Sequence, residues 1–98
     1  MKKKHRLIIT AQAEINISDA FEYYEYNQPH VGEYFLSVLE KCFLSIETNP
    51  EIYKIAFSNF RQAKVPKFPF VVIYKVELNE IIVAKVFHTY RNPIKKIK

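Results

Sequence analysis

The second half of the chain carries the side chains with the most distinctive chemistry. Its cations include Arg61, Lys64, Lys67 and Arg91, and its possible proton carriers are His88 and Tyr90. Cleavage of RNA by attack of the 2′-hydroxyl needs a base, an acid and cations beside the phosphate. The same cations would also suit a surface that binds a polyanion or an acidic protein segment. The residue types alone therefore leave a nuclease site and a binding surface open.

Spacing along the chain separates some of these candidates. If a strand runs through this region and continues far enough, Arg61, Ala63, Val65 and Lys67 share one face. Gln62 and Lys64 then share the other face. Arg61 and Lys64 would point away from each other, which weakens an active site built from both. His88 and Tyr90 are two residues apart and could face the same side.

Charge is strongly segregated along the chain. Residues 1–6 carry four basic groups, and residues 7–53 carry eight acidic groups against Lys41 alone. Residues 54–98 carry ten basic groups against two acidic ones, for a net charge of +8. This pattern predicts a bipolar surface with a basic side where an acidic partner or a polyanion would bind.

Other kinds of site find no support in the sequence. The three histidines are far apart in the chain, so we expect no metal site, and nothing suggests a cofactor. Cys42 lies in an apolar run and is expected to be a small buried hydrophobic residue. No apolar run is long enough for a signal segment or a bilayer span. We therefore expect a soluble, cytoplasmic protein.

The elements that must position these side chains follow from periodicity. Thr10 is a suitable N-cap for a helix that ends near Asn27, and a second helix should begin around Val31 and run to Thr48, ended by Asn49-Pro50. The helix faces carry apolar stripes at helical spacing, including Ala13, Ala20, Phe35, Leu39 and Ile46. The expected strands are Lys4–Ile9, Tyr53–Phe57, Phe60–Val65, Phe68–Val76 and Ile81–His88.

The order of these elements, β-α-α-β-β-β-β, predicts an α+β fold. We expect one domain over residues 1–98, with an antiparallel sheet and a helical hairpin packed on one of its faces. Tyr74, Phe68, Phe70 and Phe87 lie in the most apolar segments and are expected in the core rather than in a base-stacking surface.

Several local motifs, taken in order, resemble the RelE/ParE toxin family. They are Ala-Phe-Glu-Tyr-Tyr-Glu25, Phe35…Leu39…Ile46 followed by Asn49-Pro50, Arg61, Lys67-Phe-Pro-Phe70, Val-Val-Ile-Tyr74 and His88-Thr-Tyr-Arg91-Asn-Pro93. The resemblance covers roughly residues 6–94. It implies a growth-inhibiting toxin of a type II toxin–antitoxin system, bound in a hetero-oligomer by an antitoxin with an acidic, partly disordered segment.

Two activities occur in that family, and the resemblance implies different site residues for each. A RelE-like member would cut messenger RNA on the ribosome without a metal, using Arg61, His88, Tyr90 and Arg91. A ParE-like member would inhibit DNA gyrase and hydrolyse nothing. In that case the residues that bind the target or the antitoxin would be Arg61, Lys64, Lys67, Arg91, Lys95 and Lys96.

The closing His88…Arg91-Asn-Pro93 segment resembles the ending of ParE-like members, and this resemblance favours that branch. There, His88 and Arg91 are expected to fix the C-terminal segment to the sheet by hydrogen bonds. A non-catalytic nucleic-acid-binding module is a further alternative, although no RNP-type, helix-turn-helix or zinc motif is present.

Overall fold

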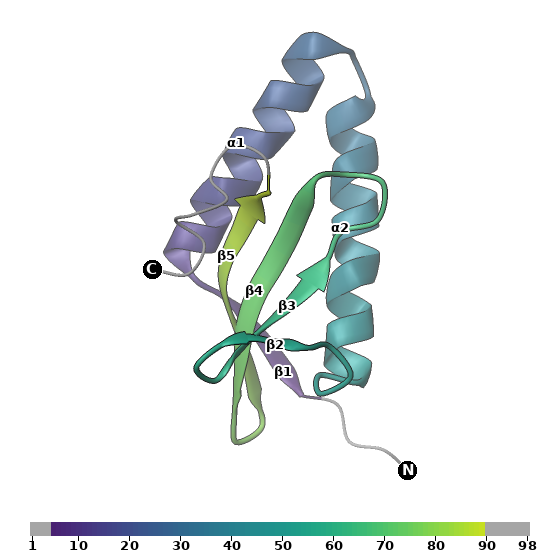
Figure 1. Ribbon diagram of the computed structural model, residues 1–98. Helices are drawn as coiled ribbons and strands as arrows, with labels where there is room; N and C mark the ends of the chain where they lie inside the picture. Colours follow the sequence, from purple (N-terminus) through teal and green to yellow (C-terminus); the bar gives the residue numbers. More distant parts are fainter. Residues whose placement is uncertain (1–4, 90–98) are drawn as a thin grey trace.

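A five-stranded sheet carries two helices on one of its faces (Figure 1). The computed structural model describes residues 5–89. The helices are α1 (Ala11–Asn27) and α2 (Val31–Thr48). The strands are β1 (Arg6–Ile9), β2 (Ile55–Phe57), β3 (Phe60–Lys64), β4 (Phe70–Glu77) and β5 (Glu80–His88). This order confirms the predicted α+β fold.

The sheet is mixed, so the prediction of a wholly antiparallel sheet is wrong for one strand. The strand order is β1-β5-β4-β3-β2, and the pairs from β2 to β5 are antiparallel. β1 instead pairs with β5 in parallel, with Leu7 opposite Ile81. Short turns force neighbouring strands to be antiparallel, but β1 is joined to the rest of the sheet through the whole helical hairpin. A connection of that length allows parallel pairing.

Side chains cap the N-terminal ends of both helices. Thr10 Oγ1 accepts a hydrogen bond from the Ala13 N–H at 3.2 Å, as its N-cap role predicts. The start of α2 has no such cap from its own N-cap residue, His30. The Glu25 carboxylate of α1 accepts instead from the His30 N–H at 3.2 Å and the Glu33 N–H at 3.1 Å. One carboxylate therefore ties the two helices together at the tip of the hairpin.

The helices approach each other closely at Gly32, the single glycine of the sequence. A Cβ atom there would lie 2.8 Å from the Phe21 carbonyl oxygen and 2.5 Å from Glu25 Cγ. The glycine is thus needed for the close approach of α1 and α2. Within residues 5–89, four non-glycine residues have positive φ in the connections, at 74°, 50°, 69° and 55° for His30, Ser58, Lys67 and Leu78.

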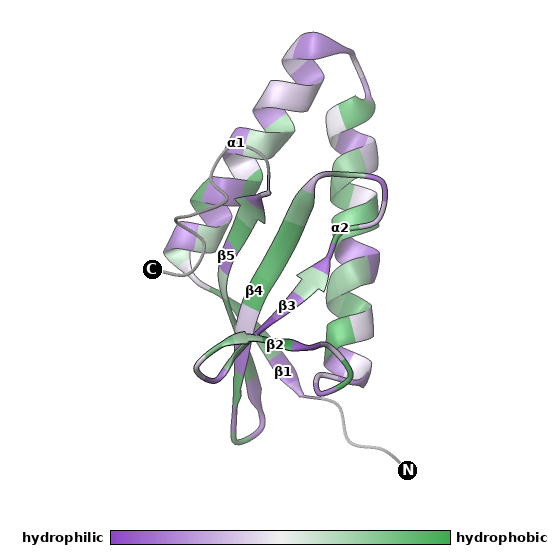
Figure 2. Ribbon diagram, viewed as in Figure 1, coloured by the Kyte–Doolittle hydropathy of each residue, from purple (hydrophilic) through white to green (hydrophobic). Residues whose placement is uncertain are grey.

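The main core lies between the helices and the sheet. Phe35, Ile46, Val65, Val72 and Tyr74 are completely buried there, which confirms the predicted apolar face of α2 and the core position of Tyr74. Figure 2 shows most of β4 coloured as hydrophobic. A smaller apolar cluster includes Val71, Ile73 and Phe87, packed with Phe57 and Phe60. Pairing and alternation place this cluster on the other face of the sheet.

Strands β2 and β4 each begin two residues later than predicted, because the residues before them make other contacts or lie in a turn. β2 begins at Ile55 rather than Tyr53, whose backbone carbonyl accepts from Arg61. β4 begins at Phe70 rather than Phe68, because the chain turns through Lys67 at a φ of 69°. Lys67 therefore lies in a turn and does not continue the strand face of Arg61.

Neither helix among residues 5–89 combines the length and apolar character needed to cross a bilayer.

Candidate functional site

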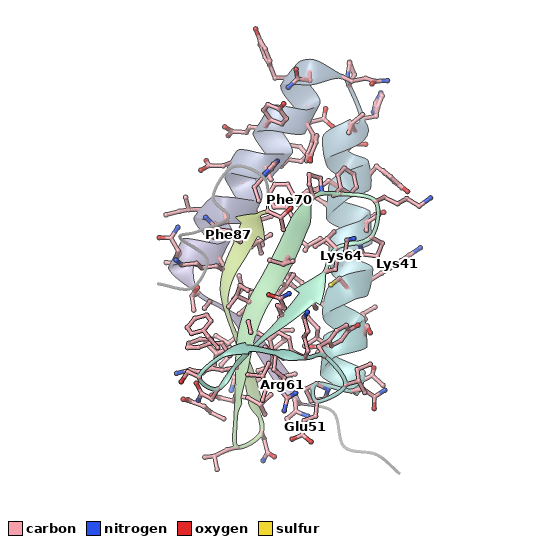
Figure 3. All side chains as sticks on the ribbon, viewed as in Figure 1. Lys41, Glu51, Arg61, Lys64, Phe70 and Phe87 are labelled. Atoms are coloured by element: carbon pink, nitrogen blue, oxygen red, sulfur yellow. The ribbon has the colours of Figure 1, made fainter. Side chains whose placement is uncertain are left out.

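Arg61 lies in β3 on the face that is turned towards the helices, together with the buried Ala63 and Val65. Its Nη1 donates a hydrogen bond to the Tyr53 carbonyl oxygen at 2.7 Å and a longer one to the Glu51 carbonyl oxygen at 3.3 Å. Both acceptors belong to the connection between α2 and β2. Arg61 thus fixes this connection against the sheet, and Figure 3 shows it beside Glu51.

Two tyrosine hydroxyls hold the same connection. The Tyr74 hydroxyl donates to the Pro50 carbonyl oxygen at 2.5 Å, and the hydroxyls of Tyr53 and Ser45 are 2.6 Å apart. Burial raises the pKa of Tyr74 to about 12, although the nearby Arg61 opposes that shift. The connection between α2 and β2 is therefore held at Pro50, Glu51 and Tyr53 by side chains from β3, β4 and α2.

A cationic cleft lies at the opposite end of β3, between that strand, the turn that follows it and α2. We call it the lysine cleft. It has a volume of about 350 Å³ and contains three lysines, Lys41, Lys64 and Lys67. Figure 3 shows Lys41 and Lys64 on the same side of the molecule. Its other lining residues are Tyr34, Ser37, Val38, Cys42, Ser45, Tyr53 and Pro66.

The predicted separation of Arg61 and Lys64 is present in the structure. Arg61 and Lys64 do not converge, because Arg61 is directed to the α2–β2 connection and Lys64 borders the lysine cleft. Lys64 and Lys67 do come together, and both also border a second hollow of about 470 Å³ beside Phe68, Pro69 and Thr89. The β3–β4 turn is thus a ridge with hollows on both sides and two lysines along it.

His88 lies far from Arg61. Pairing across β4 places Arg61 opposite Tyr74 and His88 opposite Phe70, which is four residues further along that strand. This separation is roughly 13 Å along the strand direction. The His88 ring packs edge-on against Phe70 with centroids 4.9 Å apart, at a small hollow bordered by Asn16 and Asp19 of α1.

Sequence reasoning missed Lys41 as a member of the cationic site. It is the single base among residues 7–53, and it belongs to a helix whose other charges are acidic. Its position on the flank of α2, away from the apolar stripe, was the only available signal. Only the fold shows that this flank faces the end of β3.

Two polar residues of the first helical region also make contacts with β5 that the sequence did not predict. Asn16 Oδ1 accepts from the Val86 N–H at 3.1 Å, and Thr10 Oγ1 donates to the Val83 carbonyl oxygen at 2.9 Å. Both contacts serve the edge of β5 from Val83 onward, where β1 ends with Ile9 opposite Val83. They are structural contacts of a strand edge.

Four predicted site residues, Tyr90, Arg91, Lys95 and Lys96, lie outside the described residues. Within residues 5–89, no group of three His, Cys, Asp or Glu side chains is arranged to hold a metal ion. Cys42 is buried and its burial raises the pKa of the thiol to about 11, which keeps it protonated at neutral pH.

A comparison with protein-family models identifies a family for the chain. A family model described as the ParE toxin of the type II toxin–antitoxin system parDE matches residues 7–93. No curated protein matches the chain. Two solved structures share the fold at low sequence identity. A chain of the chromosomal ParDE toxin–antitoxin system from P. aeruginosa has a TM-score of 0.77 and 12% identity, over 87% of this chain and 96% of that one.

The second is the YoeB dimer from Staphylococcus aureus, with a TM-score of 0.60 and 14% identity, over 90% of this chain and 100% of that one. These likenesses concern the fold, whereas the family match spans nearly all of the sequence. The chain therefore belongs to the ParE toxin family of type II toxin–antitoxin systems.

Proposed function

We propose that this toxin arrests growth by inhibiting DNA gyrase through protein–protein contacts. The observation that carries the proposal is that Arg61 is already hydrogen-bonded within the protein. Its guanidinium bonds to the carbonyl oxygens of Tyr53 and Glu51, so this cation serves the α2–β2 connection. The family match to the toxin of parDE supports the same branch.

The separation of two candidate catalytic groups, Arg61 and His88, also supports the proposal. Cleavage of a phosphodiester needs an acid, a base and cations gathered around one phosphate. Arg61 and His88 lie about 13 Å apart along the sheet, and His88 packs on Phe70 beside α1. This spacing argues against a shared phosphate contact for these two members of the predicted nuclease set.

The proposed partner that neutralises the toxin is an antitoxin with an acidic segment. Residues 54–98 carry a net charge of +8, and the lysine cleft gathers three of the chain's lysines in one place. An acidic segment would be attracted to that side over about a Debye length, roughly 8–10 Å at physiological salt. Such attraction mainly raises the association rate.

The test is to express the chain without its antitoxin and to follow DNA and protein synthesis together. We expect DNA synthesis to fall first, and purified toxin to block supercoiling by purified gyrase. Arg61→Met should retain inhibition in proportion to the folded fraction. Early cleavage of messenger RNA at codon-spaced positions, with gyrase unaffected, would contradict the proposal and favour the ribosome-dependent ribonuclease.

A further inference from the structure

The two helices end in a tip that projects beyond the sheet (Figure 1). The last turns of α1 carry two exposed tyrosines there, Tyr23 at 53% and Tyr26 at 91% exposure. Because they are three residues apart, the two side chains are neighbours on one flank of the helix. The residues that follow, 27–30, are also exposed. We call Tyr23, Tyr26 and residues 27–30 the tyrosine tip.

Hydrogen bonds hold the backbone of the tyrosine tip in place. The Glu25 carboxylate accepts from the N–H groups of His30 and Glu33 and so joins the two helices. Asn27 Nδ2 donates to the Tyr23 carbonyl oxygen at 2.7 Å and closes the end of α1. The tip is therefore ordered before any partner binds, which reduces the entropy lost on association.

A series of packed rings connects the tip to the main core. The Tyr23 ring packs edge-on against Tyr24, with centroids 5.4 Å apart. Tyr24 in turn packs against Phe35 at 5.5 Å and Phe68 at 5.0 Å. Tyr23 is thus held in a defined orientation, although about half of its surface is exposed. Rigid, exposed tyrosines are typical of the few residues that dominate the binding energy of protein interfaces.

The charges around the tip indicate the kind of partner. Residues 7–40 contain six acidic residues and no lysine or arginine. Glu22, one turn before Tyr26, and Glu33, at the start of α2, are both exposed. A nucleic acid would be repelled by this surface, whereas a protein pocket with a basic rim would attract it. An enzyme that binds DNA has basic surfaces, because it must neutralise phosphates.

We propose that the tyrosine tip is the anchor by which the toxin binds gyrase. The Tyr26 ring enters a pocket on a basic surface of the enzyme, Tyr23 packs at the edge of that pocket, and Glu22 faces its basic rim. This inference rests on the proposed function, because gyrase is the partner that it names.

Binding of purified gyrase to the immobilised toxin is the direct measurement. Tyr26→Ala should weaken binding at least about tenfold and reduce the inhibition of supercoiling in parallel. Tyr26→Phe keeps the ring and should stay within about twofold. Leu78→Ala is the matched control, because Leu78 is 96% exposed in the β4–β5 turn, and it should bind as the unchanged toxin does. Thermal melts should show all three variants to be folded.

The basic rim is tested by removing one carboxylate at a time. Glu22→Gln should weaken gyrase binding by about two- to fivefold at low salt, and the difference should shrink as salt increases. Glu14→Gln is the matched control in the first turn of α1, roughly 12 Å along the helix from Glu22. It should leave the affinity unchanged. Equal losses would mean that gyrase responds to the total charge of the helices, which contradicts a rim contact at the tip.

The rigidity of the tip is tested at Glu25, which positions the anchor from behind. Glu25→Ala should speed hydrogen exchange at the His30 and Glu33 amides and weaken gyrase binding by about two- to fivefold. Faster exchange with unchanged affinity would refute the contribution of rigidity.

Two other occupants of the tip would overturn the proposal. One is a second copy of the chain, shown by self-association that Tyr26→Ala abolishes while gyrase binding persists. The other is the antitoxin, shown by a Tyr26→Ala toxin that inhibits gyrase normally but is no longer neutralised. If the unchanged toxin does not bind gyrase, the proposed function fails and takes this role of the tip with it. If it binds and Tyr26→Ala binds equally well, only the role of the tip is refuted.

Discussion

The two ends of β3 carry cations in contrasting surroundings. At one end, Arg61 bonds to the Tyr53 and Glu51 carbonyl oxygens and is half-buried. At the other, Lys64 is exposed and borders the lysine cleft. The residues are three positions apart, yet one completes the fold and the other is available to a partner. The lesson is that the strand face and the neighbouring loop, rather than the charge itself, decide the role of a basic residue.

The largest expected effect concerns α2, which forms a wall of both regions. Leu39 is 3% exposed in the main core, so Leu39→Ala should lower the free energy of unfolding by about 2–4 kcal/mol. Glu22→Ala, on the exposed side of α1, should change it by less than ~0.5 kcal/mol. Urea unfolding of both variants provides the measurement. Equal effects would mean that the helix faces are assigned wrongly.

The direct test of the comparison replaces each cation by methionine. Arg61→Met removes hydrogen bonds to two carbonyl oxygens and should cost about 1–3 kcal/mol of stability. Lys64→Met should stay within ~0.5 kcal/mol, because its side chain is exposed. Chemical denaturation of the two variants side by side would decide the matter. A Lys64 variant as unstable as the Arg61 variant would refute the contrast.

The stability of the Arg61 end of β3, where Tyr74 bonds to Pro50, should also depend on alkaline pH. The folded-state pKa of Tyr74 is about 12 against an ordinary value of 10.0, because the phenol is buried. A raised pKa stabilises the fold below pH 10, and this contribution is lost as the pH rises from 10 to 12. Tyr74→Phe should cost about 1 kcal/mol at pH 7 for the lost hydrogen bond, yet destabilise less steeply between pH 10 and 12. Parallel slopes for both proteins would argue against the assignment.

The smallest effect on stability is expected at the lysine cleft. Lys41→Gln should leave the melting temperature nearly unchanged, because the side chain is exposed on α2. It should slow association with the antitoxin by about two- to fivefold at low salt, and the difference should shrink as salt screens the charge. Stopped-flow mixing at several salt concentrations measures this. A salt-independent difference would point to a packing role for Lys41.

The sequence allowed most of the fold to be predicted because the signals were local. Thr10 marks the start of α1, Asn49-Pro50 follows the end of α2, and β4 and β5 are joined by a tight turn at Leu78-Asn79. The parallel pairing of β1 could not be predicted in this way. It depends on where a distant strand fits against β5, and no nearby turn restricts its direction.

The candidate site was only partly predictable for the same reason. The alternation of side chains correctly separated Arg61 from Lys64. It gave no indication that the Tyr53 and Glu51 carbonyl oxygens would accept from Arg61, because those acceptors are backbone groups of a loop. It also could not bring Lys41 to Lys64, since that proximity arises from how α2 packs beside β3.

The placement of the single glycine has a consequence for engineering this protein. The single glycine, Gly32, lies at the contact of the two helices. The four connections therefore place non-glycine residues at positive φ, namely His30, Ser58, Lys67 and Leu78. Residues with a Cβ are strained in that conformation, and glycine is not. Leu78 is 96% exposed in the β4–β5 turn, and this turn lies far from the lysine cleft. Glycine at this position offers a way to make a more heat-resistant toxin whose binding surfaces are left as they are.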